Sequence, residues 1–405
     1  MFPRLRFVTG SAEGRSPNAR SVRVSLTNIY LFSSFFLEKV SNKVQQMTAQ
    51  NMLTKIASGR VLDYSHNIGQ YMGGMDWPGE GFVLPIATAV AAHNTVYVLG
   101  RGAESTGVAA PMEPRAFGTR VGKFSVGPTP GDEEHLLTFG SFGEAPGQFM
   151  WPTGIALDED ENVYVSDEWL NRVSVFDKDG NLLSTWGSRG SGDGELNRIS
   201  GITIDDNSNV YLVDSLNHRV QTFTRDGKFL GKWGGPGDGE GQLNSPWGIC
   251  LDQDGFVYIA DHRNHRVQKW TPQGEFLLQF GSPGDGLGQL QYPSDVTVDP
   301  AGDVYVCDWV NNRVQVFDPT GAFLTSIVGD AHEPSKWAQM TLDANADLRK
   351  ARRLVSTMEP EWRFALPTGV TFDKVASRLI VADTQRYRLQ IYNKITDYIE
   401  PQFNF

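Results

Sequence analysis

Residues 246–282, PWGICLDQDGFVYIADHRNHRVQKWTPQGEFLLQFGS, decide the fold because their pattern returns several times along the chain. An aspartate that ends a Val-Tyr-hydrophobic run recurs every 47 residues, at Asp167, Asp214, Asp261 and Asp308. A diverged copy ends at Asp383, and an earlier copy at residues 95–102 has Gly100 in place of the aspartate. A period of about 40 to 50 residues is typical of repeat proteins, in which neighbouring units share a core.

Each unit contains four short apolar runs separated by turn residues. In the first regular unit these runs are residues 154–158, 163–167, 172–176 and 182–186. Their alternating pattern, with Asp-Gly pairs at turns such as 179–180 and 254–255, predicts antiparallel strands joined by hairpins. Six units of four strands predict an all-β fold, the six-bladed β-propeller.

The unit resembles the NHL repeat. It reads P-x-G-I-x-hydrophobic-D, then V-Y-V-x-D-x-x-N-H-R-V-Q-x-F, and it matches that repeat most closely at Asn217-His218-Arg219 and Asn264-His265-Arg266. The resemblance covers roughly residues 60–397 and implies a six-bladed propeller, but a fold of this kind does not imply a function.

The ends of the chain lead to two expectations. Residues 60–68 match the outer strand of a unit, so we expect them to pair with the last blade and close the ring, leaving no free sheet edge. Residues 1–46 carry seven Lys or Arg and two Glu, a charge of +5 in a chain of net charge −11. We interpret 1–46 as an extension, disordered or absent from the mature protein, and 47–405 as the propeller.

Composition also bears on location and partners. We expect a cytoplasmic protein, or an exported or organellar one if residues 1–46 are a targeting segment. The apolar run at 29–37 is too short to span a bilayer. Because the propeller is acidic, it repels phosphate backbones, and nucleic acid is not an expected partner. We expect a monomer whose two cysteines, Cys250 and Cys307, are small buried hydrophobic residues.

The spacing grows to 75 residues between Asp308 and Asp383, which predicts an insert over about 331–364. Apolar residues recur there every three or four positions: Trp337, Met340, Ala344, Leu348, Ala351, Val355 and Met358. This period predicts a helix from about 335 to 357 between blades 5 and 6. Links between blades and turns between second and third strands share one face of a propeller, so we expect the helix to cover that face as a lid or docking surface.

An Arg follows each of the five aspartates by five positions: Arg172, Arg219, Arg266, Arg313 and Arg388. We expect each Asp and Arg to form an ion pair within or between blades. Because the pair returns in every regular unit, it indicates a scaffold role and not catalysis.

An enzyme that such propellers resemble is the peptidyl-α-hydroxyglycine α-amidating lyase. The resemblance includes an Arg-Gly pair after the first V-Y-V strand, here Arg101-Gly102, and it implies zinc-binding histidines at the second position of P-x-G. This chain has Ile86, Thr153, Ser200, Trp247, Ser294 and Thr368 at that position. A catalytic zinc needs about three protein ligands, so the sequence predicts no metal site and no cofactor.

The candidate ligand-binding residues are aromatic or basic: Trp169, Trp247, His262, Arg263 and Trp309, with Arg101 as the candidate catalytic residue. Aromatic faces with a few arginines suit an organic ligand, a carboxylate or a peptide. We expect the tryptophans, Arg101 and Arg263 to surround one pocket of a few hundred cubic ångströms at the channel mouth, under the helix. The first expectation is a binding scaffold for a protein, peptide or small organic ligand. The alternative is a lyase or hydrolase that uses Arg101 without three zinc histidines.

Overall fold

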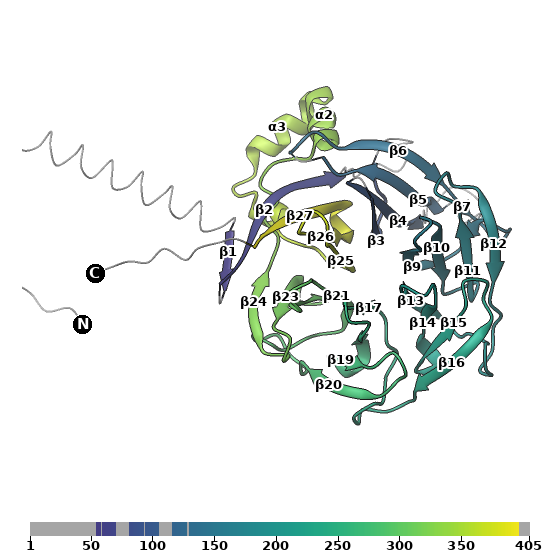
Figure 1. Ribbon diagram of the computed structural model, residues 1–405. Coiled ribbons are helices and arrows are strands. Elements are labelled where there is room, and N and C mark those ends of the chain that lie inside the picture. The colour runs from purple at the N-terminus through teal and green to yellow at the C-terminus, as the bar shows by residue number, and fades with distance from the viewer. Residues whose placement is uncertain are drawn as a thin grey trace, which may run out of the picture. The chain divides into compact units, whose positions relative to one another are not determined.

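The protein folds as a ring of six antiparallel sheets around a central channel (Figure 1), which confirms the predicted propeller. This computed structural model describes residues 54–57, 59–69, 81–92, 94–104, 116–127 and 129–396. The predicted extension at 1–46 lies outside the described residues. Each inner strand contacts the inner strand of the next blade, and the last contacts the first, so the ring is closed.

The strands follow the predicted repeat. Blade 1 contains β3 (Pro85–Ala91), β4 (Thr95–Glu104), β5 (Ala116–Ser125) and β6 (Glu134–Phe139), and blade 2 contains β9 (Pro152–Leu157), β10 (Val163–Asp167), β11 (Arg172–Phe176) and β12 (Leu182–Trp186). Blade 3 contains β13 (Ile199–Ile204), β14 (Val210–Asp214), β15 (Arg219–Phe223) and β16 (Phe229–Gly234). Blade 4 contains β17 (Ile249–Leu251), β18 (Val257–Asp261), β19 (Arg266–Trp270) and β20 (Phe276–Phe280). Blade 5 contains β21 (Pro293–Val298), β22 (Val304–Asp308), β23 (Arg313–Phe317) and β24 (Phe323–Ile327). A short parallel pair, β7 (Ser141–Phe142) and β8 (Gln148–Phe149), lies in the link between blades 1 and 2.

Blade 6 joins the two ends of the described chain. Its sheet runs in the order β1 (Thr54–Ala57), β2 (Arg60–Gly69), β27 (Arg388–Ile395), β26 (Arg378–Asp383) and β25 (Gly369–Asp373). Strand β2 pairs antiparallel with β27, from Val61 opposite Ile395 to Gly69 opposite Arg388. The predicted closure by residues 60–68 is therefore confirmed, and β27 has no free edge.

The apolar core lies between the blades. The tyrosine of the Val-Tyr run is buried in each of the first five blades: Tyr97, Tyr164, Tyr211, Tyr258 and Tyr305. Tyr258, for example, packs in one cluster with Val296 and Val306 of the next blade. Because one sheet cannot bury this face alone, the repeated pattern stabilises the ring only when six copies stack.

Four of the five predicted Asp–Arg ion pairs form. The Nε-to-Oδ2 distances are 2.7 Å for Arg219–Asp214, 2.8 Å for Arg266–Asp261, 2.7 Å for Arg313–Asp308 and 2.8 Å for Arg388–Asp383. The prediction is wrong for Asp167 and Arg172, which form no ion pair in the described part of the chain. Arg172 donates instead to the carbonyl oxygens of Glu144 and Ala145, at 2.9 and 2.7 Å. In the other four blades a glutamine also donates to the aspartate, whereas blade 2 has Ser174 at that position.

The residue before each arginine ties one blade to the next. His265 has a positive φ of 56°, and its Nδ1 accepts the backbone N–H of Tyr292 at 3.1 Å. His218 accepts an N–H in the same way, and the side-chain oxygens of Asn171 and Asn312 do so in blades 2 and 5. The repeated histidines therefore have a structural role.

The insert between blades 5 and 6 is helical, as predicted, but it consists of α2 (Lys336–Ala344), α3 (Ala346–Leu354) and α4 (Glu359–Trp362). Ser335 caps α2, and Asn345 ends α2 and caps α3, which is why one long helix does not form. None of the helices in the described residues is long and apolar enough to cross a membrane.

The predicted position of the insert over the channel is wrong. The helices α2 and α3 lie at the rim of the ring, beside β2 and β6 (Figure 1). Trp337 is buried against Phe82 and Phe124, with ring centroids 6.4 and 5.8 Å apart. Asn67 of β2 also donates to the carbonyl of Glu333 at 2.8 Å. The large apolar side chain of Trp337 thus anchors the insert in the interface of blades 6 and 1, away from the channel mouth.

Candidate functional site

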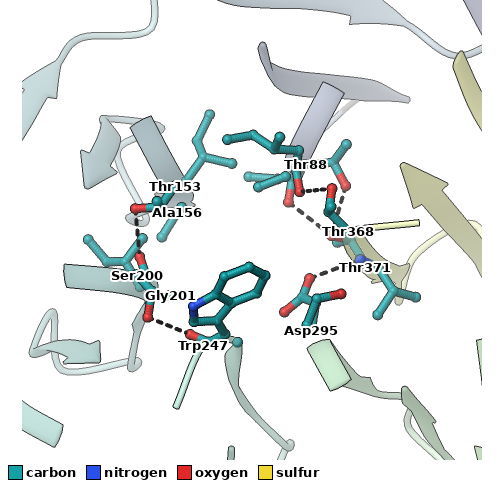
Figure 2. Close-up of a pocket in the computed structure, with 18 of the residues that line it drawn as sticks. Thr88, Thr153, Ala156, Ser200, Gly201, Trp247, Asp295, Thr368 and Thr371 are labelled. Carbon is teal, nitrogen blue, oxygen red and sulfur yellow. Dashed lines mark hydrogen bonds between the residues drawn. The ribbon is translucent and has the colours of Figure 1, made fainter. Parts of the chain in front are cut away.

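The six inner strands surround a cavity of about 700 Å³. All six residues at the second position of P-x-G line it: Ile86, Thr153, Ser200, Trp247, Ser294 and Thr368. Figure 2 shows the hydroxyl groups around the wall and the Trp247 indole extending between them. Cavities of this size hold drug-sized organic molecules.

The hydroxyl groups of this ring are used to join blades. Thr153 donates to the carbonyl of Ile199 at 3.1 Å, and Ser200 donates to the carbonyl of Trp247 at 3.0 Å. Thr368 donates to the carbonyl of Ile86 at 3.1 Å, which links the last blade to the first. These hydroxyl groups therefore mainly form hydrogen bonds between blades, and they do not by themselves make a ligand site.

Trp247 replaces such a hydroxyl group in blade 4. Its indole stacks on His262, with ring centroids 4.0 Å apart and planes inclined by 23°. The Trp309 ring lies 5.7 Å from it, and Trp309 also lines the cavity. The indoles of Trp247 and Trp309 form an aromatic wall of the cavity on the side of blades 4 and 5, and His262 supports Trp247 from outside the cavity.

Arg101 approaches the cavity from blade 1. Its guanidinium lies 4.7 Å from the centre of the Trp151 ring, and its Nε donates to the carbonyl of Pro152 at 3.3 Å. Burial lowers the pKa of Arg101, although Glu168 and Asp167 oppose that shift. Arg101 forms no ion pair with a described residue. It therefore presents N–H donors and a positive charge that Glu168 and Asp167 offset only by longer-range attraction.

His262 and Arg263 line a smaller hollow of about 370 Å³ beside the main cavity, together with Trp309. The Nδ1 of His262 lies 3.0 Å from the carbonyl oxygen of Pro293, so that nitrogen carries the proton and donates it. Burial lowers the pKa of His262 to about 4, so the ring is neutral at physiological pH. His262 stacks on Trp247, but neither His262 nor Arg263 lines the main cavity.

Trp169 is not brought to this site. Its side chain is 56% exposed and lines neither hollow. The guanidinium of Arg198 lies 5.7 Å from its ring, and Arg198 also contacts Glu168 at 3.2 Å. The prediction of one pocket under a helix is therefore wrong in two respects: Trp169 and Arg263 do not line the main cavity, and neither does any residue of α2 or α3.

Asp295 is the cavity residue that the sequence analysis missed. It lies on β21 at the third position of P-x-G, where four blades have Gly154, Gly201, Gly248 and Gly369 and blade 1 has Ala87. The backbone N–H of Val370 donates to its Oδ2 at 2.9 Å. Burial raises the pKa of the Asp295 carboxyl group to about 7. The signal was present in the sequence, because PSDV differs from PTGI and PWGI at this one position.

No group of three or more His, Cys, Asp or Glu side chains in the described ranges is arranged to hold a metal ion.

Family models match three parts of the chain. A model described as "6-bladed beta-propeller" matches residues 155–236, and the NHL repeat model matches residues 243–270 and 290–317. With the observed ring of six blades, these matches define the class as a six-bladed β-propeller. The chain contains NHL repeats, as the resemblance implied.

Individual relatives cover the chain unevenly. Protein lin-41 of Caenorhabditis elegans is 47% identical over 49 residues, which is 12% of this chain and 4% of lin-41. A structure of unknown function from Bacteroides thetaiotaomicron has a TM-score of 0.52 at 18% identity, over 82% of this chain and 76% of its own. A gluconolactonase from Xanthomonas campestris has a TM-score of 0.50 at 15% identity, over 84% and 91%. The structural likenesses show the fold.

Proposed function

We propose that this propeller is a binding protein that holds a small organic ligand, or the end of a peptide, in the cavity at the channel mouth. The observation that carries the proposal is the guanidinium of Arg101 beside Trp151, which forms no direct ion pair with a described residue, in a cavity of about 700 Å³ that Trp247 and Trp309 also line. Aromatic walls supply apolar contact area, and a guanidinium recognises a carboxylate by paired hydrogen bonds. A ligand with a carboxylate group fits this combination.

The test uses hexanoate, a simple carboxylate, with the full chain. We expect calorimetry to detect binding in the millimolar range, and we expect Arg101→Leu to weaken it at least tenfold. Arg198→Leu is the matched control, because the guanidinium of Arg198 also lies over a tryptophan ring, that of Trp169, but outside the cavity. Equal binding by the wild type and Arg101→Leu would contradict the proposal.

A second candidate function is a hydrolase that uses the same cavity. The observation that favours it is Asp295, whose pKa of about 7 suits proton transfer near neutral pH. Arg101 would then bind a negatively charged group of the substrate away from the reacting bond. The test is hydrolysis of δ-gluconolactone above the uncatalysed rate. This candidate is rejected if the wild type and Asp295→Asn give the same rate.

A further inference from the structure

The carboxyl group of Asp295 stands where the fold favours glycine. Inner strands of neighbouring blades approach closely at this position. A Cβ added at Gly201 would lie 2.5 Å from the carbonyl oxygen of Trp247, and one at Gly369 would lie 2.5 Å from that of Ile86. Four other blades therefore have no side chain here. In blade 5 one carboxylate oxygen of Asp295 accepts the N–H of Val370 from blade 6, and this bond accounts for Oδ2 but not for the negative charge.

No cation of the described chain neutralises Asp295. Two backbone N–H groups, of Val370 and Val296, face its carboxyl group, but neither carries a full charge. The thiol of Cys250 is close and is held neutral, because burial raises its pKa. The other cation of the cavity lining, Lys374, follows the end of β25 and is not among the groups that influence Asp295. A positive group supplied by a ligand would remove this imbalance.

Trp247 lies beside Asp295 on the cavity wall (Figure 2). The neutral ring of His262 covers one face of the indole, and the remainder faces the cavity. An electron-rich indole face next to a carboxylate attracts an ammonium group through a cation–π contact and an ion pair. Because His262 is neutral at physiological pH, it does not repel such a group.

Arg101 and Asp295 form separate poles of one cavity. Arg101 comes from blade 1 and Asp295 from blade 5, with blade 6 between them in the ring. The charges that influence Arg101 are Glu168 and Asp167, and Asp295 is not among them. The two poles therefore do not satisfy each other, and each remains available to a different part of a ligand.

We propose that the ligand is amphoteric: a small molecule or peptide end with a carboxylate bound by Arg101 and an amino group bound between Asp295 and Trp247. This proposal rests on the proposed function, to which it adds the second pole. It excludes simple fatty acids and neutral sugars as the best ligands of this site.

The test compares three probes of matched length by calorimetry with the full chain: hexanoate, hexylammonium and 6-aminohexanoate. We expect 6-aminohexanoate to bind at least tenfold more tightly than either singly charged probe. Asp295→Asn should weaken binding of hexylammonium and 6-aminohexanoate about tenfold and leave hexanoate unchanged. Asp295→Gly introduces the glycine that four other blades have at this position. It should change the binding of the three probes in the same way as Asp295→Asn, which would exclude a folding defect caused by asparagine.

The outcomes separate the two proposals. If hexanoate binds through Arg101 but the amino group adds no affinity, or Asp295→Asn changes nothing, the amphoteric ligand is rejected and the carboxylate site remains. If none of the three probes binds at millimolar concentration, both proposals fail.

Discussion

Replacing Lys394 by Met should destabilise the ring at its closure. The ammonium group of Lys394, on β27, contacts Asp299 and lies 2.8 Å from Oδ2 of Asp303. Arg60, on the closing strand β2, lies 3.0 Å from the other oxygen of Asp303. Two cations from blade 6 thus balance two carboxylates from the turn between β21 and β22 of blade 5.

The burial of these groups sets the expected magnitude. Lys394, Asp299 and Asp303 are buried, so Lys394→Met leaves two buried carboxylates with one cation. Removing one member of a buried ion pair costs about 3–5 kcal/mol of unfolding free energy. The Arg60 side chain is 34% exposed, so Arg60→Ala should cost about 1 kcal/mol or less, because solvent screens the pair.

Urea unfolding followed by tryptophan fluorescence would measure these differences. The matched control is Lys232→Met, which breaks an exposed pair with Asp193 and should change the free energy of unfolding by less than about 1 kcal/mol. Adding Asp299→Asn to Lys394→Met should recover part of the lost stability, because it removes the unbalanced carboxylate. If Lys394→Met unfolds at the same urea concentration as Lys232→Met, the reasoning about a buried closure cluster is refuted.

Three further predictions concern the sheet edge of β27, the hydrogen bonds between blades and the carboxyl group of Asp295. Removing residues 1–69 exposes the edge of β27, and we expect oligomers or aggregates by size-exclusion chromatography; a monomer with unchanged melting would show that β2 is dispensable. His265→Asn should cost less than about 1 kcal/mol, since asparagine accepts the same N–H in other blades, whereas His265→Leu leaves the N–H of Tyr292 unpaired and should cost about 1–3 kcal/mol in urea unfolding. Equal losses of unfolding free energy in His265→Asn and His265→Leu would contradict this prediction. The folded-state pKa of Asp295 is raised to about 7 from 3.8, so its stabilising contribution is full below pH 3.8 and is lost as the pH rises through 7. Asp295→Asn should therefore raise the melting temperature at pH 9 relative to the wild type but not at pH 4, and equal shifts at both pH values would contradict the assignment.

The fold could be predicted because each repeat contains the residues that form its share of the core. In blades 3 to 5 the Val-Tyr run and the Asp, Asn and Arg of the turn make nearly the same contacts. One correct unit therefore predicts six. The closing strand was predictable for a similar reason, since residues 60–68 resemble an outer strand with no blade of their own.

The position of the insert could not be predicted in the same way. Its period of three to four residues indicates a helix but does not say what the apolar face packs against. Only Trp337 of the predicted stripe is buried in α2 or α3, whereas Met340 and Leu348 are exposed. Trp337 packs in an apolar cluster that blades 6 and 1 form together, and that cluster exists only in the assembled ring.

The cavity residues are best distinguished by asking which departures from the repeat the fold does not need. Trp247 is such a departure, because serine or threonine at its position in other blades donates to the next blade. Trp247→Ser should therefore cost less than about 1 kcal/mol of stability while weakening hexylammonium binding at least tenfold. Trp270→Ser is the control, since Trp270 is buried between blades and its truncation should cost about 3–5 kcal/mol. If Trp247→Ser destabilises the protein as much as Trp270→Ser, Trp247 is a packing residue and the aromatic wall is not a ligand site.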